Sequence, residues 1–222
     1  VKTAGTRLEK GFQPEVEVLK SVVSRRTKAM IIVTPDNPTG RVLREDVARA
    51  IADLARDFDF WILTDEAYKT LIYEGNHVYF YKLAPERTIS INTFSKDPAI
   101  PGWRLGYVYG PAEVMPKIKL VNEEMVYCPP SFAQRLVALY LRSEVRMRYI
   151  REVVEIYRQK RDVAVTALRK YIPEAKFAVP AGSMFIFVDL SRYLNDSESF
   201  ARDLLERHGV AVVPGSYFSE YY

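Results

Sequence analysis

Four short segments of this chain carry polar side chains whose types and spacing suit chemistry on a bound aldehyde. They contain Asn37 (Asn-Pro-Thr-Gly), Asp65 (Asp-Glu-Ala-Tyr), Lys96 (Thr-Phe-Ser-Lys) and Arg104 (Gly-Trp-Arg-Leu-Gly). A neutral lysine amine forms a Schiff base with an aldehyde, and an arginine clamps a phosphate with two parallel hydrogen bonds. A carboxylate at the end of an apolar strand requires a nearby cation, because an unpaired buried charge is costly.

Each segment also has a simpler explanation when it is taken alone. Asn-Pro and Gly are strong turn formers, Asp65 suits a helix N-cap, and a loop lysine or arginine is usually exposed. Further groups favour the chemical interpretation: Tyr68 lies three residues after Asp65, and Thr93 and Ser95 place two hydroxyls just before Lys96. One ligand accounts for all of these groups, because pyridoxal phosphate has an aldehyde, a phosphate, a phenolic oxygen and a pyridine nitrogen.

The elements that must position these segments alternate between strand and helix. Apolar, β-branched runs predict strands at residues 29–33, 60–64, 88–92 and 105–109, the first of them buried on both faces. The amphipathic segment 45–58 predicts a helix between the first two. This alternation favours an α/β sheet with helical crossovers. Each motif adjoins the end of a strand, and ligands of such sheets bind at the carboxyl ends of the strands.

The segments outside this sheet are predicted to be mostly helical, and the last third of the chain forms a smaller unit. Apolar spacing predicts helices at 15–24, 112–127 and 131–141, and a long helix at about 145–171 that can join two domains. Short strands at 176–179, 184–190 and 210–213, with a helix at 198–208, predict a smaller α+β unit. We therefore expect residues 1–150 to belong to a large cofactor-binding domain and residues 151–222 to a small C-terminal domain.

Composition excludes several classes of function. Hydrophobic residues make up 48% of the 222, enough for a sizeable core, and no apolar run has the length of a membrane span. Cys128 is the single cysteine, so no intrachain disulfide forms, and the separated His77 and His208 predict no metal site. The net charge of +4 comes with i,i+4 pairs of opposite charge in the long helix, which favours a solvated surface over a nucleic-acid partner. These pairs are Glu144/Arg148, Arg148/Glu152, Arg151/Glu155 and Arg158/Asp162.

In their order and spacing the four motifs resemble those of the class I and II aminotransferases, which are fold type I pyridoxal-phosphate enzymes. The resemblance covers essentially the whole chain, including the Val-Val-Pro-Gly segment near its end. It implies a three-layer, mostly parallel α/β sheet and transfer of an amino group from an amino acid to a 2-oxo acid by a ping-pong mechanism. It also implies a cytoplasmic homodimer with shared active sites.

The resemblance assigns a role to each site residue. It implies that Lys96 forms the Schiff base (aldimine) with pyridoxal phosphate and later moves the substrate's α-proton, and that Asp65 keeps the pyridine nitrogen protonated. Asn37 and Tyr68 would hydrogen-bond the phenolic oxygen, and Asn37 would also help to place the substrate carboxylate. Phosphate binding falls to Arg104, Ser95 and Thr93, the last of which stands where the family more often has serine.

Parts of the family pattern are missing. Members are nearly twice this length, so we expect Val1 and Tyr222 to be cut ends, with the phosphate-cupping loop and the carboxylate-binding arginine lying outside. The same motifs also occur in fold type I lyases and synthases, and related domains serve as ligand sensors in some regulators. A protein limited to these 222 residues is expected to bind the cofactor poorly, and the substrate amino acid is not specified.

Overall fold

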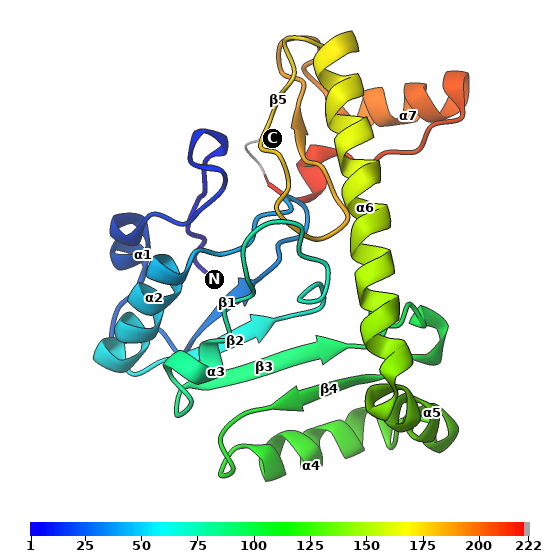
Figure 1. The fold of residues 1–222 in the computed structure, drawn as a ribbon. Helices are drawn as coiled ribbons and strands as arrows, with labels where there is room; N and C mark the ends of the chain where they lie inside the picture. Colours follow the sequence, from blue (N-terminus) through cyan, green and yellow to red (C-terminus); the bar gives the residue numbers. More distant parts are fainter. Residues whose placement is uncertain (220–222) are drawn as a thin grey trace.

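In a computed structural model of the protein, which describes residues 1–219, four strands form the central sheet in the order β1-β2-β3-β4 (Figure 1). β1 (Ala29–Val33), β2 (Trp61–Asp65) and β3 (Thr88–Thr93) run parallel, and β4 (Gly106–Tyr109) is antiparallel to β3. The mostly parallel α/β sheet expected from the sequence is therefore confirmed.

The register of the sheet brings the four motifs to one edge. Val33 pairs with Asp65, and both are the last residues of their strands. Thr93, the last residue of β3, pairs with Gly106, the first residue of β4. Because β4 runs in the opposite direction, the segment before it meets the carboxyl ends of the parallel strands. The loops after β1, β2 and β3 and the loop before β4 consequently share one edge.

Three helices accompany the sheet: α1 (Val16–Val22), α2 (Glu45–Phe58) and α3 (Phe80–Leu83). α2 begins with acidic residues and ends at Asp59, whose left-handed backbone donates its N–H to the carbonyl of Ala55. Its apolar face packs into the main core, where fully burying a side chain such as Ile51 or Phe60 contributes about 2 kcal/mol. The crossover between β1 and β2 is thus fixed by this core.

Helices α4 (Met115–Val126), α5 (Ser131–Arg142) and α6 (Glu144–Tyr171) follow the sheet. α5 contributes Ala133 and Val137 to a second core, which also contains Phe94 and Leu105 from the segment between β3 and β4. In Figure 1, α6 runs past the edge of the sheet toward which β3 points. The long helix predicted at about 145–171 is confirmed, whereas the domain boundary near residue 150 stays a prediction.

The C-terminal part contains β5 (Lys176–Phe177), β6 (Val188–Asp189) and α7 (Ser197–His208). Asp196 caps α7 by accepting hydrogen bonds from the backbone of Glu198 and Ser199, and Gly209 ends the helix in the left-handed region. Short 3-10 helices are η1 (Leu8–Lys10), η2 (Pro101–Trp103) and η3 (Gly215–Tyr217). Among residues 1–219, no helix is long and apolar enough to cross a membrane.

Several expectations about strands need correction, and one about an end of the chain falls outside the described residues. Within residues 1–219, β1 is not buried on both faces: it is the end strand of the described sheet, and Ile31 is 72% exposed. Residues 210–213 are apolar but form no strand, because no described segment pairs with them. The strands predicted at 176–179 and 184–190 shrink to two residues each, and Tyr222 lies outside the described residues.

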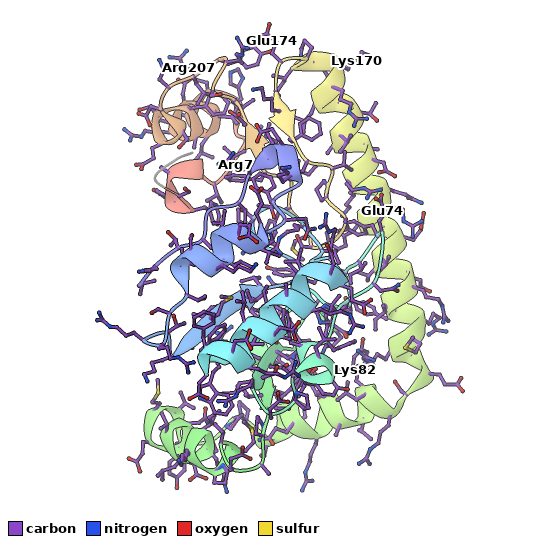
Figure 2. The ribbon with its side chains drawn as sticks, turned by 90° about the vertical axis from the view of Figure 1, so that its left-hand side faces the viewer. Arg7, Glu74, Lys82, Lys170, Glu174 and Arg207 are labelled. Atoms are coloured by element: carbon purple, nitrogen blue, oxygen red, sulfur yellow. The ribbon has the colours of Figure 1, made fainter. Side chains whose placement is uncertain are left out.

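The predicted i,i+4 ion pairs of the long helix are also wrong for the part of the chain that the structure describes. Within it, none of the four predicted pairs comes within ion-pair distance. Instead Arg158 approaches Glu155 at 3.5 Å, and Arg161 pairs with Glu74 at 2.8 Å and with its neighbour Asp162. Arg161 therefore serves a tertiary contact rather than a solvated face of the helix; Figure 2 shows Glu74 beside α6.

Candidate functional site

The loop after β1 holds Asn37 in a tightly bonded turn. Asp36 accepts hydrogen bonds from the backbone and hydroxyl of Thr39, and its other carboxylate oxygen pairs with Arg41 at 3.2 Å. Gly40 has a φ of +70° and lies against Gly182 and neighbouring residues, where a Cβ atom would meet the Gly182 carbonyl oxygen at 3.0 Å. The Asn37 side chain itself is exposed and has no hydrogen bond to residues 1–219.

Asp65 and Tyr68 stand on the turn that follows β2. The Asp65 carboxylate is half-buried and accepts a hydrogen bond from the backbone of Ala67 at 2.9 Å. The ring of Tyr68 is buried and packs edge-on against Phe185, 5.5 Å between centroids. Burial and the charge of Asp65 raise the pKa of Tyr68. Its hydroxyl therefore remains protonated at neutral pH and can donate a hydrogen bond.

Lys96 follows β3 and faces the same turn. Its Nζ lies 5.6 Å from the centre of the Tyr68 ring, close enough for an attraction between the cation and the ring. Just before it, the hydroxyl of Thr93 donates to the Ser95 hydroxyl at 2.9 Å and accepts from the Ser95 backbone at 3.0 Å. The Ser95 hydroxyl accepts in this pair, so its own hydrogen is free for an anion.

Arg104 approaches from the segment that leads into β4. Its backbone has a φ of +50°, and its exposed guanidinium donates only to the Pro101 carbonyl, at 3.1 Å, among the described residues. The backbone N–H of Phe94 donates to the carbonyl of Leu105 at 3.0 Å, which places the arginine segment beside the Thr93–Ser95 pair. Gly106 allows this approach, since a Cβ atom there would lie 2.6 Å from the Asn92 carbonyl oxygen.

The two glycines of this motif therefore differ. At Gly102 a Cβ atom would meet nothing within 4 Å, so close approach requires glycine only at position 106.

The side chains at this edge fit pyridoxal phosphate. Within residues 1–219, no cation reaches ion-pair distance of the half-buried Asp65 carboxylate, and no anion reaches that distance of Lys96 or Arg104. For the half-buried Asp65 and Lys96 an unpaired charge is costly unless a ligand completes it, whereas the exposed Arg104 is open to a ligand without that cost. A pyridinium nitrogen would complete Asp65, an aldehyde would react with Lys96, and a phosphate would take Arg104 with the two hydroxyls. Among the same residues, no cluster of His, Cys, Asp and Glu could hold a metal ion.

Sequence reasoning missed Glu66, which is 1% exposed and lies beneath the site. It accepts hydrogen bonds from Asn92 at 3.0 Å and from Tyr109 at 3.0 and 3.1 Å, and Lys69 lies 3.2 Å away. Burial by itself would raise the pKa of Glu66, but His77, Asn92 and Lys69 stabilise the carboxylate and lower its pKa to about 2.

The signal that could have revealed Glu66 is the alternation of side chains along a strand. Successive residues point to opposite faces, so Thr64 and Glu66 share a face that Asp65 does not. The hydrogen bond from the Thr64 hydroxyl to Glu66, at 3.3 Å, confirms this placement. Glu66 therefore points to the opposite face of the sheet from Asp65, where Asn92, Tyr109 and Lys69 bind it.

Comparison with known proteins identifies the family. The family described as "Aminotransferase class I and II" matches residues 1–220. The chain belongs to the class I and II aminotransferases. The resemblance stated from the motifs is thereby confirmed, and so is the fold expected from it.

Individual relatives agree with the family assignment. The chain is 37% identical to the aspartate aminotransferase of Pyrococcus horikoshii over 213 residues, which are 96% of this chain and 54% of that protein. It is 34% identical to an arginine–pyruvate transaminase of Pseudomonas aeruginosa, covering 96% of this chain and 54% of the relative. The chain thus spans about half the length of the curated relatives it matches.

Solved structures give the same result. The aspartate aminotransferase from Thermus thermophilus with maleate superposes with a TM-score of 0.91 at 36% identity, covering 97% of this chain and 56% of that one. The aromatic aminotransferase from Pyrococcus horikoshii gives 0.93 at 32% identity, covering 98% and 58%. At these values the family's three-layer sheet is shown for the part that the chain contains.

Proposed function

We propose that this chain carries much of the pyridoxal-phosphate site of an aminotransferase that exchanges an amino group between an amino acid and a 2-oxo acid. The observation that carries the proposal is the set of unpaired groups at one sheet edge, with Asp65 and Lys96 as its two half-buried charges. Relatives named for aspartate, aromatic amino acids and arginine support the substrate class without selecting one member.

Pyridoxal phosphate, when bound, supplies an electron sink that stabilises the negative charge left on the α-carbon after its proton departs. Lys96 would hold the aldehyde group through Nζ, and its amine would accept the proton of the substrate α-carbon. Asp65 would hold a proton on the pyridine nitrogen, because its carboxylate is otherwise without a cation among the described residues. The Tyr68 hydroxyl, whose pKa is raised, and the Asn37 amide would donate to the phenolic oxygen.

Phosphate binding is the task of Thr93, Ser95 and Arg104 in this proposal. What supports this is the pairing of Thr93 with Gly106, which brings the segment of the two hydroxyls beside the segment that carries Arg104. We further propose a cytoplasmic homodimer with shared sites. The small domain is proposed to comprise residues 151–222, with the boundary inside α6.

The decisive experiment incubates the full-length protein with pyridoxal phosphate, reduces it with borohydride and maps the modified lysine by mass spectrometry. We expect the label on Lys96. A panel of amino acids with 2-oxoglutarate or pyruvate then tests exchange, and we expect 2-oxo acid to accumulate without release of ammonia. Ammonia release without exchange would favour a lyase of the same fold, and cofactor binding without turnover would favour a sensing domain.

A further inference from the structure

Asp97 follows Lys96 directly. The two oxygens of its carboxylate are bound by one residue near the end of α5 and one near the start of α6. The Tyr140 hydroxyl donates to Oδ1 at 2.7 Å, and the Arg146 guanidinium lies 2.8 Å from Oδ2. The Asp97 side chain is 13% exposed and that of Arg146 is 25% exposed. Water therefore competes weakly for this ion pair, in contrast to an ordinary surface pair.

The two donors, Tyr140 and Arg146, lie on either side of a short junction between helices. α5 ends at Arg142 and α6 begins at Glu144, so a single residue, Ser143, separates the helices. Both the backbone and the hydroxyl of Ser143 donate to the Tyr140 carbonyl, at 3.1 and 2.8 Å. Burial and the carboxylate of Asp97 raise the pKa of Tyr140, so its hydroxyl stays protonated and continues to donate.

The other hydrogen bonds of the loop that carries Lys96 are internal to it: the Phe94 backbone donates to the Leu105 carbonyl at 3.0 Å and accepts from the Ile100 backbone at 3.3 Å. Between the end of β3 and the start of β4 its regular structure is the short helix η2. Its ends pack through Phe94 and Leu105 against α5, but apolar packing is non-directional. Lys96 itself has no ion pair or hydrogen bond within residues 1–219, so the position of its amine depends on the backbone that Asp97 holds.

Helix α6 makes a second contact through Arg161, with the segment that follows Tyr68. Its guanidinium lies 2.8 Å from Glu74 and 2.9 Å from the Pro180 carbonyl oxygen, and it stacks 5.2 Å from the Tyr73 ring centre. Tyr73 and Glu74 continue the segment that begins at Tyr68. One helix thus contacts both the loop of Lys96 and the segment of Tyr68, the two residues whose side chains face each other.

We propose that Asp97 is a positioning residue, which fixes the Lys96 backbone at the cofactor site by binding Tyr140 and Arg146 at the α5–α6 junction. The inference rests on the proposed function for the identity of the reacting group. In this proposal, a displacement of the start of α6 moves the Lys96 amine, so the position of the long helix affects the position of the reacting group.

The test uses the full-length protein with Asp97→Asn and Arg146→Gln, alone and combined, and Glu86→Gln as control. Glu86 pairs with Arg56 of α2 at 2.8 Å, away from the site, so the control loses an ion pair of the same length that is more exposed to water. Amide hydrogen exchange of residues 94–104, measured without added cofactor, reports how readily the loop opens. The rate at which pyridoxal phosphate becomes trapped on Lys96 by borohydride, and the pH midpoint of the bound cofactor's visible absorption, report the amine.

We expect each single variant to speed exchange and to slow trapping about tenfold, with no further change in the double variant. The pH midpoint should move in both single variants and stay constant in Glu86→Gln. Asp97→Glu should recover part of the trapping rate, because it keeps the charge. Unchanged trapping and an unchanged midpoint in Asp97→Asn would overturn the positioning role, whereas a wild-type Lys96 that is never trapped would contradict the proposed function itself.

Discussion

The Nζ atom of Lys96 lies 5.6 Å from the centre of the Tyr68 ring, although the two residues come from loops after different strands. β2 and β3 end at the same edge of the sheet, and the edge-on contact with Phe185 keeps the tyrosine ring in place. The tyrosine ring and the amine thus lie close together at the edge of the sheet where Asp65 ends β2. The two side chains come together because their motifs follow neighbouring strands of the sheet, which no single motif determines.

Replacing the amine of Lys96 should abolish turnover while leaving the fold intact. In Lys96→Arg the guanidinium stays charged and cannot form a Schiff base, so we expect at least about a thousandfold loss of amino-group transfer. Thermal unfolding should change little, since Lys96 makes no ion pair with the described residues. Lys82→Arg, on α3, is the matched control; equal activity in both variants would exclude Lys96 as the reacting amine.

Removing the hydroxyl of Tyr68 should weaken cofactor binding without removing it. The raised pKa of Tyr68 makes this hydroxyl a donor, and one hydrogen bond to a charged acceptor is worth about 1.5–3 kcal/mol. Tyr68→Phe should therefore bind pyridoxal phosphate roughly tenfold or more weakly, measured by equilibrium titration of its absorbance. Tyr193→Phe, in the C-terminal part, should match the wild type; a Tyr68→Phe affinity equal to it would remove the tyrosine from the site.

The buried carboxylate of Glu66 should make stability depend on acid. Its pKa is about 2 in the folded protein against 4.5 ordinarily, so its stabilising contribution is present above pH 4.5 and is lost as the pH falls through 2. A pKa lowered from 4.5 to about 2 corresponds to about 3 kcal/mol of unfolding free energy. We expect Glu66→Gln to unfold more easily by about that amount at pH 7, with the difference shrinking toward pH 2.

Denaturant unfolding at several pH values measures this effect. Glu124→Gln on α4 removes an exposed carboxylate and should leave stability unchanged within about 0.5 kcal/mol. A Glu66→Gln deficit that stayed constant from pH 7 down to pH 2 would show that the side chain acts by packing and not through its charge.

Local patterns predicted the strands of the central sheet and helix α2 within a residue of their observed bounds, because the apolar runs end abruptly at polar motifs. The roles of the site residues stay a prediction, although the register brings their segments to one edge of the sheet. The roles of Glu66 and Asp97 were not predicted, because the residues that bind them lie far along the chain. Tyr109 is 43 residues from Glu66, and Arg146 is 49 residues from Asp97. No periodicity in the sequence records such pairings.

The failures in the fold have the same origin. An apolar run such as Ala29–Val33 predicts burial, but the actual exposure of Ile31 depends on whether another strand lies beside it. Residues 210–213 likewise have strand composition without a partner among the described residues. Strand formation requires pairing across the sheet, so composition alone identifies candidates and tertiary structure selects among them.

Gly40 offers a test of how the Asn37 turn is held. Its φ is +70°, and a Cβ atom would collide with Pro180 and lie 3.0 Å from the Gly182 carbonyl oxygen. Gly11 has a similar φ of +59° but open space around it. Gly40→Ala should therefore cost about 2–4 kcal/mol of unfolding free energy and Gly11→Ala about 1 kcal/mol, because only the first combines backbone strain with a clash.

Urea unfolding gives both free energies, and cofactor titration connects them to the site. If the turn aims Asn37 at the ligand, Gly40→Ala should also bind pyridoxal phosphate more weakly, whereas Gly11→Ala should bind it normally. Equal destabilisation by the two alanines would mean that the backbone conformation alone sets the requirement for glycine. In that case the packing of Gly40 against Gly182 would not be what orients the Asn37 turn.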